Sequence, residues 1–236
     1  MRDILNLMRW NSQDNSKKTF ESQKEAEDYH KFAKKYFRRE KLADYIAKTF
    51  QELIPPGSTI IDSAAGTGIV TKSLMAKNFE VISFDISPYQ LDLLRHIIPG
   101  ATTIIGDINS PISCRNESVN GITQVGANRF MTVEGQELFI NRAFSLLKKE
   151  GIFIYPVFLG EIFSSKHKHG LKQKAFSFEI SKFMEKCGFE ILETSTLIHG
   201  VAGGATCTLI VAQKKSNPKQ RSFGEMLKKS LNIKII

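Results

Sequence analysis

Short apolar runs and longer stretches of helical spacing alternate along the middle of the chain. The apolar runs predict strands at residues 58–62, 80–85, 102–105, 119–125 and 151–157. Between them, apolar residues recur at helical spacing over residues 68–77, 89–97 and 135–147. Strands that alternate with helices in this way are typical of βαβ units, which place neighbouring strands parallel in one sheet.

The last third of the chain follows a different pattern. Helical spacing over residues 176–187 ends at Gly188, and two strand-like runs follow at 189–197 and 206–213 without a helix between them. Two strands joined without a crossover helix form an antiparallel hairpin. The sequence therefore predicts an α/β fold: a Rossmann-like, mostly parallel seven-stranded sheet with a closing antiparallel strand and helices on both faces.

Three segments surround this predicted sheet. Residues 20–54 carry amphipathic helical spacing, so we expect residues 1–54 to form an N-terminal helical cap with flexible first residues. The α/β domain is expected over residues 55–213, with a polar lid insertion at about 159–174. Residues 214–236 are expected to form a basic C-terminal tail with a short amphipathic run.

The composition indicates the cellular compartment in which we expect the protein. The chain has 236 residues, 42% of them hydrophobic, and no run of about 20 apolar residues of the kind that crosses a membrane. Its three cysteines are an odd number and lack the spacing of metal ligands. This pattern favours the reducing cytoplasm, and we expect no bound metal.

The net charge of +9 is distributed unevenly. Residues 161–236 carry 13 Lys and Arg against 6 Asp and Glu, whereas residues 61–160 carry 8 against 9. A basic tail attracts RNA, anionic lipid or an acidic partner through long-range forces. A solvated, lysine-rich surface explains the same charge, because the aromatic residues do not alternate with the lysines as in a nucleic-acid motif.

Acidic residues and glycines stand at the carboxyl ends of the first three predicted strands, where open parallel sheets bind their ligands. After the first strand, Gly66 and Gly68 let the backbone turn tightly and come close to a ligand. The second strand ends at Asp85, about 20 residues after these glycines. This spacing is typical of a carboxylate that binds ribose hydroxyls. The third is followed by Asp107, which can meet an adenine amino group.

The first of these loops favours a cationic ligand over a pyrophosphate. A dinucleotide-binding fingerprint requires a third glycine where Thr71 stands. It also does not ordinarily place a carboxylate at the strand end, as Asp62 is placed. A carboxylate there suits an ammonium or sulfonium group, so a nicotinamide-dependent oxidoreductase is a remote alternative.

These strand ends resemble the motifs of the class I S-adenosylmethionine-dependent methyltransferases over roughly residues 45–213. The glycine-rich motif matches residues 60–68, the ribose-binding motif 81–87 and the adenine-binding motif 106–108. The resemblance implies that S-adenosyl-L-methionine is the cofactor and that the loop backbone holds its methionine part. It further implies that Asp85 binds the ribose, and that Asp107 and the Ile108 backbone bind the adenine. The expected cofactor-binding residues are Asp62, Ala64, Ala65, Gly66, Gly68, Asp85, Ile86, Asp107, Ile108 and Gln124.

The fourth predicted strand departs from the family pattern. Val119-Asn120-Gly121 lacks the common aromatic and aspartate residues, and the segment after the strand lacks the usual histidine. A general base is optional, because the methyl group is already activated and the protein mainly aligns the nucleophile. Candidate bases are Tyr29, His30, Tyr36 and His199. The expected acceptor-binding residues are Tyr29, Phe32, Tyr36, Asn128 and Arg129.

The leading hypothesis is a cytoplasmic methyltransferase that transfers a methyl group in line to a small-molecule acceptor. The basic tail supports an RNA or protein methyltransferase as an alternative. Two further alternatives are a cyclase or aminobutyryl transferase that uses the same cofactor without methylating, and a binding module without catalysis. No motif in the chain identifies the acceptor or the oligomeric state.

Overall fold

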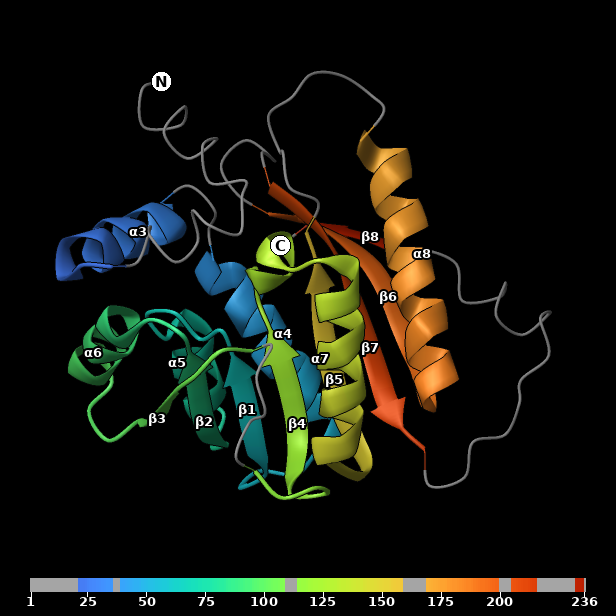
Figure 1. The fold of residues 1–236 in the computed structure, drawn as a ribbon, viewed down its shortest axis with the longest axis horizontal. Coiled ribbons are helices and arrows are strands. Elements are labelled where there is room, and N and C mark those ends of the chain that lie inside the picture. Colours follow the sequence, from blue (N-terminus) through green and yellow to red (C-terminus); the bar gives the residue numbers. More distant parts are fainter. Residues whose placement is uncertain are drawn as a thin grey trace.

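A computed structural model describes residues 21–35, 39–108, 114–158, 169–199, 205–215 and 232–235. One mixed sheet runs through the molecule with helices on both of its faces (Figure 1). The helices are α3 (Gln23–Lys35), α4 (Arg39–Leu53), α5 (Ile69–Met75), α6 (Pro88–Ile97), the short 3-10 helix η1 (Ala127–Phe130), α7 (Val133–Leu146) and α8 (His169–Cys187). The strands are β1 (Thr59–Ser63), β2 (Glu80–Asp85), β3 (Thr102–Ile105), β4 (Val119–Gln124), β5 (Leu147–Val157), β6 (Phe189–His199), β7 (Ala205–Lys214) and β8 (Asn232–Ile235).

The strands follow the order β3-β2-β1-β4-β5-β7-β6-β8. The first five strands of this order pair in parallel, and β7 pairs antiparallel with both β5 and β6. The direction of the strand order reverses between β1 and β4. The carboxyl ends of these two strands therefore flank the crevice in which sheets of this type bind ligands.

The seven predicted strands and the antiparallel closure are confirmed. The tail adds an eighth strand, because β8 pairs in parallel with β6 where the sequence predicted only an amphipathic run. Helix α8 begins at His169, so the end of the expected lid, residues 169–174, is helical. The rest of that lid, residues 159–168, lies outside the described residues.

Apolar side chains form one core cluster on each face of the sheet. On one face, Leu42 and Phe50 of α4 pack over Ile60 of β1. On the other face, Phe139 of α7 and Met184 of α8 belong to the second cluster. Strands buried on both faces are typical of parallel sheets covered by helices, which explains their nearly continuous apolar sequences.

Gly121 in β4 explains one departure from the family pattern. A Cβ added at this glycine would lie 2.8 Å from Cε1 of Phe50, so the absence of a side chain lets α4 approach the sheet. The neighbouring Asn120 accepts a hydrogen bond from Lys148 Nζ at 3.1 Å, near the start of the strand. Both residues therefore serve the packing of the fold.

The predicted helical segment before the first strand consists of α3 and α4. Helix α4 lies on one face of the sheet, and α3 lies above the ends of β1 and β2, next to α6 (Figure 1). No helix in the described part of the chain is long and apolar enough to cross a membrane.

Candidate active site

The loop after β1 turns through three residues of positive φ. Ala64, Gly66 and Gly68 have φ angles of +57°, +56° and +82°. Gly68 is required for space as well, because an added Cβ would lie 2.6 Å from Cγ of Leu94. Ala64 occupies a region that costs an L-residue about 1–2 kcal/mol. The loop therefore holds a strained turn with little side-chain bulk, as a closely approaching ligand requires.

Asp85 at the end of β2 holds this loop in place. Its Oδ2 accepts a hydrogen bond from the N–H of Gly66 at 2.8 Å, and its Oδ1 accepts one from the N–H of Ser87 at 2.9 Å. Burial raises the pKa of Asp85, and the hydrogen bonds from Ser87 and Gly66 oppose this rise. The carboxylate is thus fixed between the glycine-rich loop and the start of α6.

Asp62 at the end of β1 is the most deeply buried acid of the site, with 1% of its surface exposed. Its Oδ2 accepts a hydrogen bond from the Thr71 hydroxyl at 2.7 Å, and that hydroxyl lies 2.8 Å from Ser83 Oγ. Burial raises the pKa of Asp62 to about 7, the Thr71 bond opposes the rise, and the charge of Asp85 adds to it. Thr71, which replaces the glycine of a dinucleotide fingerprint, therefore orients Asp62.

Asp62 and Asp85 are two buried carboxylates, and neither forms an ion pair within the described residues. Buried charges in folded proteins are normally compensated by an opposite charge. A carboxylate has several lone-pair positions, so the Thr71 bond leaves Asp62 able to accept an ammonium group. The pair of carboxylates fits a ligand that carries positive charge.

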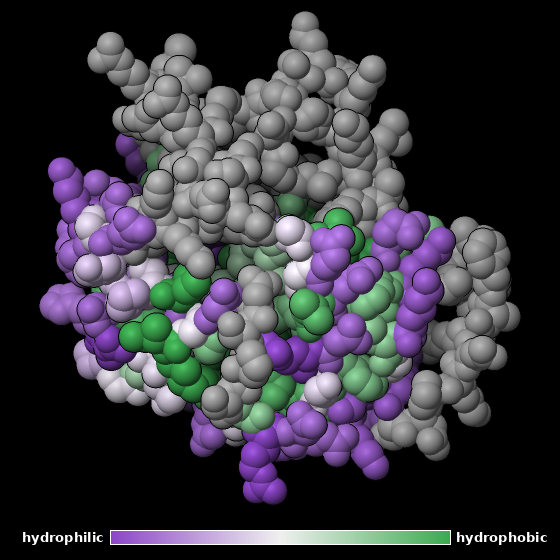
Figure 2. All heavy atoms as spheres, in the orientation of Figure 1, coloured by the Kyte–Doolittle hydropathy of each residue, from purple (hydrophilic) through white to green (hydrophobic). Residues whose placement is uncertain are grey.

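Apolar side chains adjoin the two acidic residues on the β3 side. Ile86 is 43% exposed and Ile105 is 58% exposed. Apolar side chains gather over α6 and β3 on the face shown in Figure 2. Ile108, which follows Asp107, is partly buried against the core. Such a surface suits a flat aromatic base.

Buried polar atoms that have no hydrogen-bond partner among the described residues gather where β1 and β4 end. Oε1 of Gln124 is buried and has no hydrogen-bond partner in the described part of the chain, and the same holds for Oγ of Ser63, which is in register with Gln124. Asn128 in η1 donates through Nδ2 to the Phe158 carbonyl at 3.0 Å, while its buried Oδ1 has no described partner. Unsatisfied buried polar atoms are rare in proteins, and here they indicate a ligand or bound water.

A buried hydrogen-bond network supports Asn128 from behind. The Tyr155 hydroxyl donates to Gln136 Oε1 at 3.0 Å, and Gln136 Nε2 donates to the Asn128 carbonyl at 3.5 Å. Burial raises the pKa of Tyr155, so this hydroxyl keeps its proton. The sequence analysis missed this network, although a tyrosine within the apolar run of β5 was a signal for it.

Helix α3 contacts the glycine-rich loop through His30. Nδ1 of His30 lies 2.6 Å from Oγ1 of Thr67. Burial lowers the pKa of His30; Lys34 and Lys72 add to the lowering, whereas Glu40 opposes it. The imidazole is therefore neutral at pH 7. The sequence analysis considered His30 only as a base and did not predict this contact.

Arg39 at the start of α4 is a second residue that the sequence analysis missed. It is 5% exposed, and its guanidinium carbon lies 4.4 Å from the centroid of the Phe158 ring. Because the Phe158 carbonyl accepts the hydrogen bond from Asn128, this stacking links α4 to the end of β4. Arg39 stands in the charged run Arg38-Arg39-Glu40-Lys41, and nothing in the sequence distinguishes it from its neighbours.

The structure brings the expected cofactor residues to one edge of the sheet, with Tyr29 and Phe32 half-buried on α3 beside it. Arg129 lies in η1, but its side chain is outside the described part. Tyr36 also lies outside the described residues. His199 ends β6, which β5 and β7 separate from β4, and its side chain is not among those described. No cluster of metal-ligating side chains occurs among the described residues.

A strained glycine-rich loop, two buried carboxylates and exposed apolar side chains thus adjoin at one edge of the α/β sheet. Residues 60–151 match the family model described as a methyltransferase domain. A search of curated proteins found no match. The chain therefore contains a methyltransferase domain, and it has the fold of S-adenosylmethionine-dependent methyltransferases.

Solved structures of low sequence identity share the fold. A putative S-adenosylmethionine-dependent methyltransferase from Methanococcus maripaludis is 14% identical with a TM-score of 0.61, and the match covers 84% of this chain and 95% of that one. Magnesium protoporphyrin IX methyltransferase from Synechocystis, solved with bound S-adenosylmethionine, is 15% identical with a TM-score of 0.56, covering 75% and 80%. 1,6-Didemethyltoxoflavin-N1-methyltransferase from Burkholderia thailandensis, solved with its acceptor and S-adenosylhomocysteine, is 13% identical with a TM-score of 0.56, covering 75% and 78%.

Proposed function

We propose that this methyltransferase acts on a small-molecule acceptor by direct in-line transfer. The observation that carries the proposal is the contact of α3 with the cofactor loop through His30 and Thr67. This contact brings the half-buried Tyr29 and Phe32 to the carboxyl edge of the sheet, and in our proposal these two side chains narrow the approach to the cofactor. An approach covered by a helix suits a small acceptor better than a nucleic-acid duplex. Two of the structural neighbours, by their descriptions, act on small molecules, which supports the same assignment.

S-adenosylmethionine supplies a methyl group on a positively charged sulfur. In our proposal, Asp62 binds its ammonium group and Asp85 its ribose, while the loop from Ala64 to Gly68 fixes the methionine part. Ile86, Asp107 and Ile108 hold the adenine. These contacts fix the direction in which the methyl group points, and alignment of this kind is the main contribution a protein makes to such a transfer.

The acceptor is expected to lie beyond the end of β4. Gln124 and Asn128 each present a buried oxygen without a described partner, which favours an acceptor that donates hydrogen bonds. Tyr29 and Phe32 of α3 and Arg129 of η1 are the expected walls of this site. Covering by α3 excludes water from the reacting groups.

The test is a product screen with the purified full chain, S-adenosylmethionine and a panel of small amines, phenols and carboxylic acids, followed by mass analysis. We expect S-adenosylhomocysteine together with an acceptor that has gained one methyl group. The Asp85→Ala variant, run in parallel, should form neither product.

Each alternative has its own outcome in this screen. S-adenosylhomocysteine that forms only after addition of RNA or protein would identify a macromolecular acceptor and contradict the proposal. 5′-Methylthioadenosine as the product would indicate cyclisation or aminobutyryl transfer. Binding of the cofactor without any product across the whole panel would favour a binding module.

A further inference from the structure

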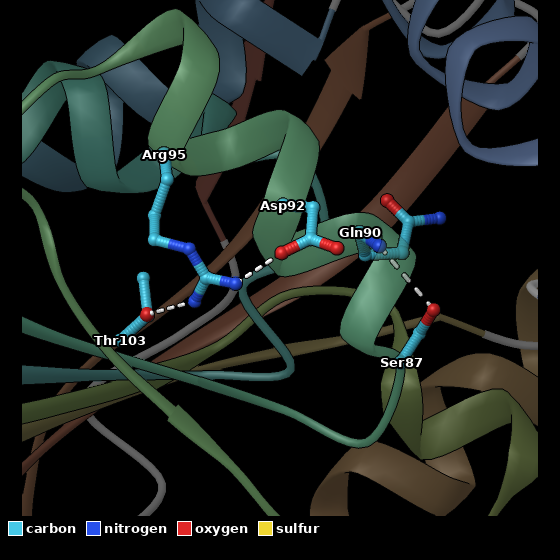
Figure 3. Close-up of polar contacts among 5 residues, drawn as sticks. All are labelled: Ser87, Gln90, Asp92, Arg95 and Thr103. Atoms are coloured by element: carbon cyan, nitrogen blue, oxygen red, sulfur yellow. Dashed lines mark hydrogen bonds and ion pairs between the residues drawn. The ribbon is translucent and has the colours of Figure 1, made fainter. Parts of the chain in front are cut away.

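Gln90, in the first turn of α6, is held against the cofactor loop. Its backbone N–H donates to the Ser87 hydroxyl at 3.3 Å, which caps the helix (Figure 3). The N–H of Ser87 in turn donates to Asp85. The backbone of Gln90 is therefore fixed relative to the carboxylate that we assign to the ribose.

The side chain of Gln90 faces the glycine-rich loop. A Cβ added at Gly66 would lie 3.6 Å from Oε1 of Gln90, and one added at Gly68 would lie 2.6 Å from Cγ of Leu94. Residues four apart on a helix share one face, so Gln90 and Leu94 form a single ridge along the loop. Leu94 makes the apolar contact expected of such a ridge, whereas Gln90 places an amide at the corresponding position.

This amide is buried and incompletely satisfied. Gln90 is 2% exposed, and its Oε1 has no hydrogen-bond partner in the described part of the chain. The polar contacts of Arg95 with Asp92 and Thr103 lie on the other side of α6 (Figure 3). An apolar side chain would fill the same space without the cost of an unsatisfied carbonyl. A glutamine here therefore indicates a ligand that donates a hydrogen bond to it.

We propose that Gln90 is a further cofactor-binding residue, whose amide oxygen accepts a hydrogen bond from the nucleoside half of S-adenosylmethionine beside Asp85. This inference rests on the cofactor assignment and on the ribose position in the proposed function. It does not depend on the acceptor, so a failed acceptor screen leaves it unaffected. The nucleoside half offers hydroxyl and amino donors, and both are present in 5′-methylthioadenosine.

The test is calorimetric binding of S-adenosylhomocysteine and of 5′-methylthioadenosine to the wild type and to Gln90→Met. Methionine has a similar length and lacks the amide oxygen. We expect both affinities to fall by about fivefold, the size of effect that one hydrogen bond produces. Unchanged affinities would overturn the proposal. A loss confined to S-adenosylhomocysteine would place the contact on the amino-acid half and would overturn it as well.

The melting temperature of the ligand-free variant separates binding from packing. Removal of an unsatisfied buried oxygen should leave this temperature unchanged or raise it. Ser118→Ala is the matched control, because it removes another buried oxygen without a described partner, in the loop that precedes β4. This control should bind both ligands as the wild type does. A lowered melting temperature for Gln90→Met with weaker binding of both ligands would identify a packing residue and overturn the proposal.

Discussion

The donor half of the site, from β1 to the residues after β3, is built differently from the acceptor half around α3, η1 and Phe158. In the donor half, the key contacts join residues close in sequence: Thr71 and Asp62 are 9 positions apart, and Gly66 and Asp85 are 19 apart. In the acceptor half, Asn128 reaches Phe158 over 30 positions, and His30 reaches Thr67 over 37. In our proposal, cofactor binding therefore depends on local turns, whereas the acceptor site also depends on contacts between segments far apart in the sequence.

The largest expected effect is a loss of cofactor binding in Asp85→Ala. This change removes the proposed ribose contacts and the bond from the Gly66 N–H that holds the loop. Two charge-assisted hydrogen bonds correspond to a loss of roughly 100-fold in affinity for S-adenosylhomocysteine, measured by calorimetry. Asn128→Ala, in the acceptor half, should bind S-adenosylhomocysteine within about twofold of the wild type, because truncation there removes no donor contact. Comparable losses in the two variants would remove the distinction between the halves.

A smaller and pH-dependent effect is expected for Asp62→Asn. The folded-state pKa of about 7 lies above the ordinary value of 3.8, so the folded protein holds this proton more tightly than the unfolded chain. The stabilising effect of the proton is complete below pH 3.8 and is lost as the pH rises through 7. Ligand-free Asp62→Asn should therefore melt higher than the wild type at pH 8, and the advantage should shrink towards pH 5.

The same Asp62→Asn variant should bind S-adenosylhomocysteine about tenfold more weakly at pH 8, because an amide does not compensate the charge of an ammonium group. Thermal melting at pH 5, 6, 7 and 8 tests the stability effect, and calorimetry tests the affinity. A gain in stability that does not vary with pH would show that Asp62 does not titrate in this range.

The smallest expected effect is a gain in stability from Ala64→Gly. The change relieves the left-handed strain at this position but adds conformational entropy to the unfolded chain, which leaves a net gain of about 0.5 kcal/mol. Ala65→Gly is the matched control, because Ala65 is not among the residues with positive φ. It should lose about 0.5–1 kcal/mol. Urea denaturation measures both, and equal signs for the two variants would contradict the account of loop strain.

The difference between the donor half and the acceptor half also explains how much of the fold and of the site the sequence could predict. The sequence predicted that Asp62 and Asp85 lie at one edge of the sheet, because strand ends are visible in the apolar pattern and the rules of parallel sheets place these ends together. Gln90 was not among the predicted residues, because its proposed contact depends on the rotation of α6 against the loop. Arg39 and the Tyr155 network were missed for a similar reason, because local sequence spacing does not predict which helix packs beside which strand end.

The pairing of β8 with β6 has a consequence for work on the basic tail. Deletion of residues 214–236 would remove β8, and with it Lys214, whose Nζ contacts Glu117 at 3.2 Å and the Leu147 carbonyl at 2.8 Å. The deletion would expose the backbone of β6 as a free edge, and such edges promote aggregation. A truncated protein could therefore lose RNA binding through self-association alone. Lysine-to-glutamine substitutions within residues 215–231 keep the last strand in place and are the cleaner way to test the charge of this segment.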